Sequence, residues 1–199
     1  MDKISLIAHL RSQEFPTKII RAFKKIPREE FIPKEYKLQA YLDIPLPIGN
    51  NVTISQPFTI AFMLNLLELK NNQKILEIGS GSGYVLALLA EITKGKIYGV
   101  EIIKELAIKS RQILKKSNYK NIKVINKSGK LGLSEFAPYD RILISASANE
   151  IPYYLTEQLK ENGIIVSSVR NSIIKIKKQK EKITTEEFPG FVFVPLVNG

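Results

Sequence analysis

The chain has 199 residues, a net charge of +11, one histidine and no cysteine, and 44% of its residues are hydrophobic and 25% charged. This length and balance are those of one globular domain, and the lack of cysteine excludes disulfides, thiolate metal sites and cysteine nucleophiles. His9 lies in the charged stretch HLRSQEF and is expected to be a solvated surface residue. The chemistry of this protein must therefore need little proton shuttling, and no metal is expected.

No run of about 18 apolar residues is present, and charges interrupt the N-terminal stretch where a signal peptide needs an apolar core. The sequence therefore indicates a cytoplasmic protein with no membrane partner. Its densest basic segment, IIKIKKQKEKI, alternates apolar and charged residues. That alternation favours the solvated face of a strand over a nucleic-acid site, so nucleic acid is not the expected partner.

Apolar spacing predicts a first helix over 15–26, which ends before Pro27. Residues 27–57 form a long segment punctuated by prolines, and such a segment predicts an ordered surface arm with a functional role. Beyond it, amphipathic helices alternate with strands rich in Ile and Val. The predicted helices are 58–69, 84–93, 104–117 and 152–162, and the predicted strands are 74–79, 96–101, 122–126, 141–146, 164–169, 172–178 and 191–197.

This alternation predicts right-handed crossovers and an α/β fold with a doubly wound, mostly parallel seven-stranded sheet. No helix separates the last two strands, which are expected to form an antiparallel hairpin at one edge. Residues 1–57 are expected to be an N-terminal helical arm and lid, and residues 58–199 the α/β domain that binds the cofactor. The two together should form one compact unit.

The first strand-to-helix turn of the sheet, LEIGSGSGY, contains Gly79, Gly81 and Gly83. Glycine is needed where the backbone turns sharply and approaches a ligand closely. The spacing differs from the G-x-G-x-x-G of dinucleotide sites, and no Lys-Ser/Thr pair follows as in a P-loop, which argues against NAD and ATP. The alternative is that the glycines only allow close packing of strand and helix.

Two acidic residues flank this turn: Glu77 precedes the first glycine, and Glu101 ends the next strand. A carboxylate at that strand end can accept both hydrogen bonds of a ribose diol. Glu77 would favour a cationic ligand over a pyrophosphate. S-adenosylmethionine combines ribose, adenine and positive charge, and is the predicted cofactor.

With these residues in view, the chain resembles the protein-L-isoaspartate (D-aspartate) O-methyltransferases, a family with the Rossmann-like class I methyltransferase fold. The resemblance covers about 18–197. It rests on the blocks IPREEFIP (26–33), AYLDIPLPIGNNVTISQP (40–57), LEIGSGSGY (76–84), APYDRILISASANEIPYYLTEQLKENG (137–163) and FVPLV (193–197). The glycine turn alone would indicate only a methyltransferase, whereas PLPIG followed by TISQP is particular to this family.

The resemblance implies methyl transfer from S-adenosylmethionine to the free carboxylate of an isoaspartyl residue in a damaged protein, with S-adenosylhomocysteine as product. That carboxylate is already ionised at neutral pH, so no general base is needed. The methyl ester would then cyclise to a succinimide without the enzyme, and hydrolysis would restore some normal aspartate. The expected partners are therefore proteins or peptides that contain isoaspartate.

Ser55 matches the active-site serine of the family, whose hydroxyl would hold the substrate carboxylate. On the residue alone it could equally cap the helix that starts near Pro57. The same match places further residues around the cofactor: Glu77, Gly79, Ser80, Gly81 and Gly83 at the methionine end, Glu101 and Ile102 at the ribose, and Thr53 and Ile54 in a lid.

Two departures from the family pattern affect the site. Lys127, Ser128 and Gly129 replace a Gly-Asp-Gly motif, so Ser128 and Gly129 would face the adenine with a weaker acceptor, at a cost of about 1–3 kcal/mol. After strand 164–169, Asn171 stands in for a glutamine and is assigned to substrate binding.

These departures leave two alternative functions open: a class I methyltransferase for another substrate such as RNA, and a non-catalytic homologue with weakened cofactor binding. The oligomeric state is not predicted.

Overall fold

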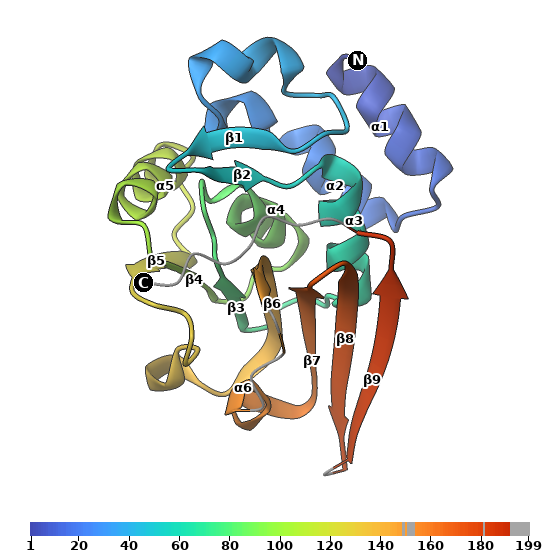
Figure 1. Cartoon of the computed structure of the whole chain (residues 1–199), viewed down its shortest axis with the longest axis vertical. Coiled ribbons are helices and arrows are strands. Elements are labelled where there is room, and N and C mark those ends of the chain that lie inside the picture. The colour runs from blue at the N-terminus through green and yellow to red at the C-terminus, as the bar shows by residue number, and fades with distance from the viewer. Residues whose placement is uncertain (149, 151–153, 181, 192–199) are drawn as a thin grey trace.

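A seven-stranded sheet forms the centre of the protein in the computed structural model, with strand order β5-β4-β3-β6-β7-β8-β9 (Figure 1). The structure describes residues 1–148, 150, 154–180 and 182–191. The strands are β3 (Ile75–Ile78), β4 (Ile97–Glu101), β5 (Ile122–Asn126), β6 (Tyr139–Ala148), β7 (Leu159–Val169), β8 (Ser172–Gln179) and β9 (Lys182–Pro189). Neighbours from β5 to β7 pair in parallel, and β8 and β9 continue the sheet antiparallel. The predicted fold class, with its antiparallel edge, is confirmed.

Each face of the sheet has its own apolar layer, because successive side chains of a strand point to opposite faces. Ile75 belongs to a cluster with α2 (Thr17–Lys25), α3 (Pro57–Leu66), α4 (Tyr84–Ile92) and α5 (Lys104–Lys116). Leu76, the next residue, belongs to a second cluster with Leu133 and Leu155, near the short helices η3 (Ser134–Phe136) and α6 (Tyr154–Glu157). Helical elements thus cover both faces, as a doubly wound sheet requires.

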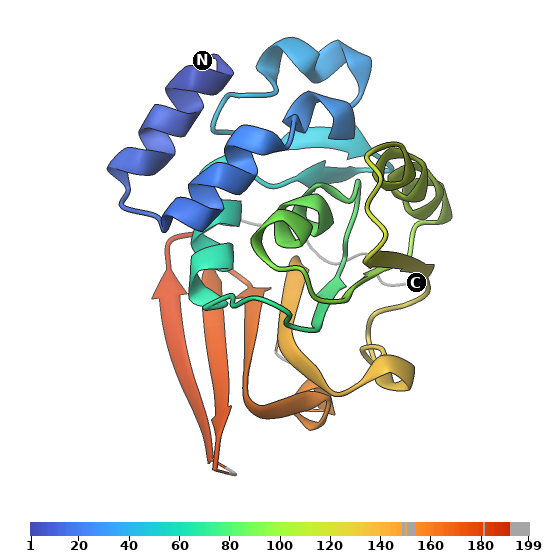
Figure 2. The same ribbon diagram turned by 180° about the vertical axis from the view of Figure 1, so that it is seen from behind.

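The N-terminal segment lies across the carboxyl ends of the parallel strands. It comprises α1 (Lys3–Ser12), α2, η1 (Arg28–Phe31), η2 (Lys34–Gln39) and an antiparallel hairpin of β1 (Leu46–Gly49) and β2 (Val52–Ile54). Figure 1 shows this hairpin above the ends of β6 and β7, and Figure 2 shows α2 between α1 and α4. Leu46 and Ile54 of the hairpin share one apolar cluster with Tyr84 of α4, so this segment is packed onto the sheet domain.

Helix α1 was not predicted, because its charged residues obscure a narrow apolar stripe. Leu6, Ile7 and Leu10 are buried, and the Asp2 carboxylate accepts a hydrogen bond from the Ser5 amide at 2.8 Å. An N-cap followed by apolar residues at i, i+1 and i+4 is the signal that could have identified the helix.

The predicted helix over 152–162 is wrong in its second half. The helix α6 ends at Glu157, and the chain continues as β7 from Leu159, which is opposite Tyr139 of β6. The Tyr139 amide donates to the Gln158 carbonyl at 2.8 Å, so pairing with β6 overrides the helical spacing of these residues. Residues 152–153 lie outside the described residues.

The edge strand β9 (Lys182–Pro189) was not predicted, and the last predicted strand is 191–197, of which only Phe191 is described. All but one of the residues of β9 are exposed, so the sequence of this strand has no apolar alternation by which it could be identified. Residues 192–197, including the block FVPLV, lie outside the described residues.

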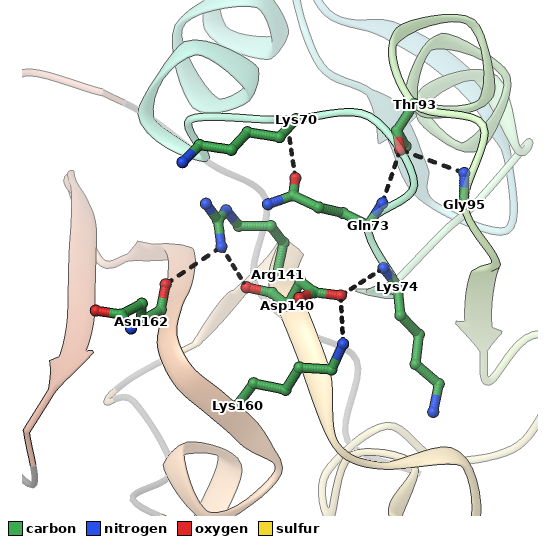
Figure 3. Close-up of polar contacts among 9 residues, drawn as sticks. All are labelled: Lys70, Gln73, Lys74, Thr93, Gly95, Asp140, Arg141, Lys160 and Asn162. Carbon is green, nitrogen blue, oxygen red and sulfur yellow. Dashed lines mark hydrogen bonds and ion pairs between the residues drawn. The ribbon is translucent and has the colours of Figure 1, made fainter.

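A polar network holds the amino ends of β3 and β6 together (Figure 3). The Asp140 carboxylate accepts from the Lys74 amide at 2.7 Å and from the Lys160 ammonium at 2.9 Å. Burial by itself would raise the pKa of Asp140. These bonds outweigh that effect and hold the pKa below its usual value. The buried guanidinium of Arg141 donates only to main-chain carbonyls, those of Leu67, Glu68, Asp140 and Asn162.

Thr93 extends this network toward α4. It is fully buried, and its hydroxyl oxygen accepts from the amides of Gln73 at 3.1 Å and Gly95 at 3.3 Å. The Gln73 side chain in turn accepts from the Lys70 amide at 2.6 Å. The polar groups at this end of the sheet are thus satisfied by one another.

Candidate functional site

The turn between β3 and α4 is built from glycines in left-handed backbone conformations. Gly79, Gly81 and Gly83 have φ values of +76°, +50° and +85°. A Cβ atom on Gly79 would lie 2.8 Å from the Cβ of Ala146, and one on Gly81 would lie 3.0 Å from the Ile48 side chain. Glycine is therefore required both by the conformation and by the space around the turn.

Glu101, at the end of β4, joins the glycine turn to the start of α5. Its two carboxylate oxygens accept from the amides of Gly81 at 2.7 Å and Ile103 at 2.9 Å, and the residue is only 5% exposed. The Asn126 side chain donates to the carbonyls of Glu101 and Ile102 at 2.8 and 2.9 Å. A carboxylate has about four acceptor directions, so Glu101 keeps capacity for the hydroxyls of a ribose.

Glu77 is the most unusual group of the site, because it is a buried carboxyl group with one unpartnered oxygen. Its Oε1 atom accepts from the Ser145 hydroxyl at 2.7 Å, whereas Oε2 has no hydrogen-bond partner among the described residues. Burial raises the pKa of Glu77 to about 8, against the opposing effect of the Ser145 bond. A ligand cation beside Oε2 would supply the missing partner and favour the charged form.

The β1–β2 hairpin covers this carboxyl group and the glycine turn. Between them lies a cavity of about 50 Å³, which has room for a small group rather than a whole nucleoside. Its lining comprises Ile48, Thr53, Ile54, Ser55, Ile60, Met63, Glu77, Gly79, Ser80, Gly81, Ser82, Tyr84, Val85, Leu143 and Ser145. The predicted lid residues and Ser55 thus share one cavity with Glu77, Gly79, Ser80 and Gly81.

Ser55 does not cap the following helix, which resolves the alternative left open by the sequence. The N-cap of α3 is Gln56, and no side chain at that position bonds to the helix. Instead, the Phe58 amide in the first turn donates to the Asp43 carboxylate at 2.7 Å. The cap therefore comes from another segment, and the Ser55 hydroxyl remains at the cavity wall.

Ser128 and Gly129 follow β5 at the exposed side of the site. Ser128 is exposed, and its hydroxyl accepts only a long bond of 3.4 Å from the Lys130 amide. A Cβ atom on Gly129 would lie 2.4 Å from the Ile78 side chain, so this glycine is required by close packing. Of the predicted cofactor residues, Gly83, Glu101, Ile102, Ser128 and Gly129 do not line the small cavity.

Asn171 lies in the turn between β7 and β8, and its side chain is exposed. Its backbone carbonyl accepts from the amides of Gly190 and Phe191, which ties the end of β9 to this turn. The structure does not place Asn171 in the lining of the cavity.

His9 lies away from the cavity, with its Nε2 atom 3.8 Å from the Asp43 carboxylate and 39% of its side chain exposed. Within the described ranges, no group of three or more His, Cys, Asp or Glu residues is arranged to hold a metal ion. The described helices include none that is long and apolar enough to cross a membrane.

Several site residues were missed in the sequence. Ser145 could have been found, because it lies near the carboxyl end of β6, just past the residues paired with β3, and side chains near such ends meet at one edge. Tyr84 directly follows the last glycine. By contrast, Ile48 and Arg28 reach the site only through the folding of the N-terminal segment, and no local pattern identifies them.

The structure supports a ligand of the predicted kind: the glycine turn allows close approach, Glu101 can accept from a ribose, and Glu77 offers an unpartnered oxygen to a cation.

The family model described as protein-L-isoaspartate(D-aspartate) O-methyltransferase matches residues 1–199. A protein-L-isoaspartate O-methyltransferase of Methanococcoides burtonii is 41% identical over 198 residues, covering 96% of this chain and 98% of that protein. One of Fervidobacterium nodosum is 42% identical over 197 residues, covering 96% and 99%.

Solved structures agree with these sequence matches. A protein-L-isoaspartate O-methyltransferase structure superposes with a TM-score of 0.92 at 27% identity and covers 99% of this chain, which spans 66% of that chain. A Plasmodium falciparum structure described as a protein-L-isoaspartate O-methyltransferase in complex with S-adenosyl-L-homocysteine has a TM-score of 0.82 at 25% identity and covers 97% of both chains.

Proposed function

The chain belongs to the protein-L-isoaspartate(D-aspartate) O-methyltransferase family, and on that premise we propose that it methylates the free carboxylate of L-isoaspartyl residues in damaged proteins or peptides. The observation that carries this proposal is the cavity beneath the β1–β2 hairpin. Ser55 and Glu77 both line this cavity, and one carboxyl oxygen of Glu77 has no hydrogen-bond partner among the described residues, which supports a site for a cation beside a carboxylate.

S-adenosylmethionine, when bound, supplies an electrophilic methyl group on a cationic sulfur. Glu77, Ser80 and the glycine turn (Gly79, Gly81 and Gly83) would hold its methionine end, Glu101 and Ile102 its ribose, and Ser128 and Gly129 its adenine, with Thr53 and Ile54 above. Because Ser128 is neutral and exposed, the adenine contact would be the weakest of these.

Ser55 would donate a hydrogen bond to the isoaspartyl carboxylate and hold one of its oxygens in line with the methyl group. The carboxylate is ionised at neutral pH, so the chain need not supply a base. The apolar side chains of Ile54, Ile60 and Met63 line the same cavity and would exclude water. Alignment and water exclusion are then the main contributions of the protein.

We propose that residues 1–57 act as the helical arm and lid of the 58–199 domain, and that the exposed Asn171 amide contacts the substrate from the β7–β8 turn. The hydrogen bonds from Gly190 and Phe191 hold that turn in place and support this role. The cytoplasmic location expected from the sequence is part of the same proposal.

The test is transfer of a tritiated methyl group to an isoaspartyl peptide, the matching aspartyl peptide and bulk RNA. We expect labelling of the isoaspartyl peptide alone. Labelling of RNA instead would contradict the proposed substrate, and a lack of heat with S-adenosylhomocysteine at millimolar concentration in calorimetry would contradict the cofactor.

In the same assay Ser55→Ala should lower kcat about ten- to hundred-fold, because it removes the group that aligns the carboxylate. The dissociation constant for S-adenosylhomocysteine should hardly change. Ser117→Ala, on the exposed end of α5, is the control and should retain the wild-type kcat. A wild-type kcat in Ser55→Ala would remove this serine from the mechanism.

A further inference from the structure

Arg28 is wholly buried, with none of its surface exposed, yet it forms no ion pair with any carboxylate in the described part of the chain. One terminal nitrogen of its guanidinium donates to the Ser55 carbonyl at 2.9 Å, and the other donates to the Ile44 carbonyl at 3.1 Å. Its Nε atom has no hydrogen-bond partner in the part of the chain that the structure describes. Burial lowers the pKa of the guanidinium to about 10 and outweighs the Asp43 carboxylate, which is close enough to favour the charged form of Arg28. Burying this charge is costly, so stability alone does not explain the arrangement.

The two carbonyl groups lie at opposite ends of one structural unit. Ile44 precedes β1, and Ser55 directly follows β2, so the guanidinium joins the entry and the exit of the β1–β2 hairpin. The same guanidinium lies 5.8 Å from the centre of the ring of Tyr84, which is the residue that directly follows the glycine turn. One side chain thus contacts both ends of the hairpin and the start of α4.

We propose that Arg28 is a positioning residue, which fixes Ser55 at the cavity wall by joining the two ends of the β1–β2 hairpin. This inference rests on the proposed function, because it assigns Arg28 a role in the reaction through Ser55. The planar guanidinium donates in two fixed directions at once, whereas a lysine ammonium is a compact donor that does not reproduce this geometry. Three residues beyond Ser55, the Phe58 amide donates to the Asp43 carboxylate at 2.7 Å, so the chain that follows Ser55 is also held.

The chain offers a matched control in Arg141. That side chain is also buried, at 5% exposed, and also donates only to main-chain carbonyls, but it lies at the amino ends of the strands. The experiment compares Arg28→Lys with Arg141→Lys in methyl transfer to an isoaspartyl peptide, well below the melting temperature of both variants.

We expect Arg28→Lys to lower kcat by about ten- to hundred-fold, because a displacement of about 1 Å in a reacting geometry can cost that much. Its KM for the peptide and its dissociation constant for S-adenosylhomocysteine should stay within about twofold of the wild type, since Ser55 acts on alignment. Arg141→Lys should lower the melting temperature and retain the wild-type kcat. An unchanged kcat in Arg28→Lys, or an equal loss in both variants, would overturn the proposal.

Hydrogen exchange of the cofactor-free proteins gives a readout that does not depend on the reaction. Arg28→Lys should speed exchange within 44–56, and Arg141→Lys should leave that segment unchanged. A wild-type protein that fails to methylate the isoaspartyl peptide would contradict the proposed function, whereas wild-type exchange in Arg28→Lys would contradict the role of Arg28.

Should Arg28→Lys fail to fold, the native protein still provides a test by nitrogen-15 NMR of arginine side chains. The two terminal groups of Arg28 should exchange their protons slowly with solvent, because both are bonded and buried. Rapid exchange of these protons would overturn the proposal.

Discussion

The two ends of the central sheet differ in how far their buried polar groups are hydrogen-bonded. At the carboxyl ends of the parallel strands, three buried atoms have no hydrogen bond to any described residue: Glu77 Oε2, Ser80 Oγ and the nearby Arg28 Nε. At the amino ends, Thr93, Asp140 and Arg141 have several partners each. Buried groups without partners cost stability, so the first end gives up stability where we propose that a ligand binds, whereas the second end stabilises the fold.

The largest difference between the two ends is expected when one hydrogen-bond acceptor is removed from each of them. Glu101→Ala deletes a carboxylate that holds two amides and would accept from the ribose, so the affinity for S-adenosylhomocysteine should fall about a hundred-fold or more. Asp140→Ala should lower the melting temperature instead and change that affinity by less than about twofold. Calorimetry and thermal unfolding check both, and an equal loss of affinity in Asp140→Ala would contradict the separation.

Thr93→Val tests the structural end alone. Valine keeps the shape of threonine but removes the oxygen that accepts from the Gln73 and Gly95 amides, which should destabilise the protein by about 2–3 kcal/mol. Urea unfolding should show a lower midpoint with an unchanged slope, and cofactor affinity should be retained. A loss below about 0.5 kcal/mol would mean that water satisfies these amides.

Glu77→Gln tests the ligand end through pH. Burial raises the pKa of Glu77 to about 8 in the folded protein, above its value in the unfolded chain. The folded state therefore binds this proton more tightly than the unfolded chain does. The stability that the bound proton contributes is fully present below the unfolded pKa of Glu77 and is lost as pH rises through about 8. Glutamine cannot ionise, so the melting temperature of Glu77→Gln relative to the wild type should increase between about pH 4.5 and pH 8 and level off above pH 8.

The same variant should bind S-adenosylmethionine about tenfold more weakly, because it lacks the charge that meets the ligand cation. The wild-type affinity should rise with pH through about 8 as Glu77 ionises, and the variant should lose this rise. Calorimetry across this pH range measures both effects. A variant that binds as tightly as the wild type, with the same pH profile, would exclude Glu77 from cofactor binding.

The smallest effect is expected at Ser80. Its buried hydroxyl has no partner, so Ser80→Ala should change the free energy of unfolding by less than about 0.5 kcal/mol. Ser110→Ala is the matched change, because that hydroxyl is fully buried but donates to the Ala107 carbonyl, and its loss should cost about 1 kcal/mol. Unfolding in urea measures both variants, and the reverse order would contradict the comparison.

The sequence predicted the parts of the fold that local periodicity determines. Strands β3 to β6 and helices α3 to α5 were found because their apolar residues repeat with the period of the element. The helix over 152–162 failed because pairing with β6 decided the conformation of 159–162. The strand β9 was missed because an edge strand with two exposed faces carries no such pattern.

The site divides in the same way. Glu77, Gly81 and Glu101 were identified because they lie at strand ends, which a parallel sheet brings to one edge. Arg28 was not, because its partners at Ile44 and Ser55 are main-chain carbonyls, which any residue provides. The cap of α3 was also not predicted, because Asp43, which accepts from the Phe58 amide, is distant in the sequence, and the sequence offers Ser55 only as an alternative cap.

Helix α3 is attached at both of its ends by residues from elsewhere in the chain. Asp43 holds the Phe58 amide at its start, and Arg141 holds the Leu67 and Glu68 carbonyls at its end. Each residue added to a helix turns its far end by about 100° and lengthens it by about 1.5 Å. A single insertion or deletion in this helix would therefore break one attachment whatever residue was used, so the two attachments constrain the number of residues in this helix and not only their types.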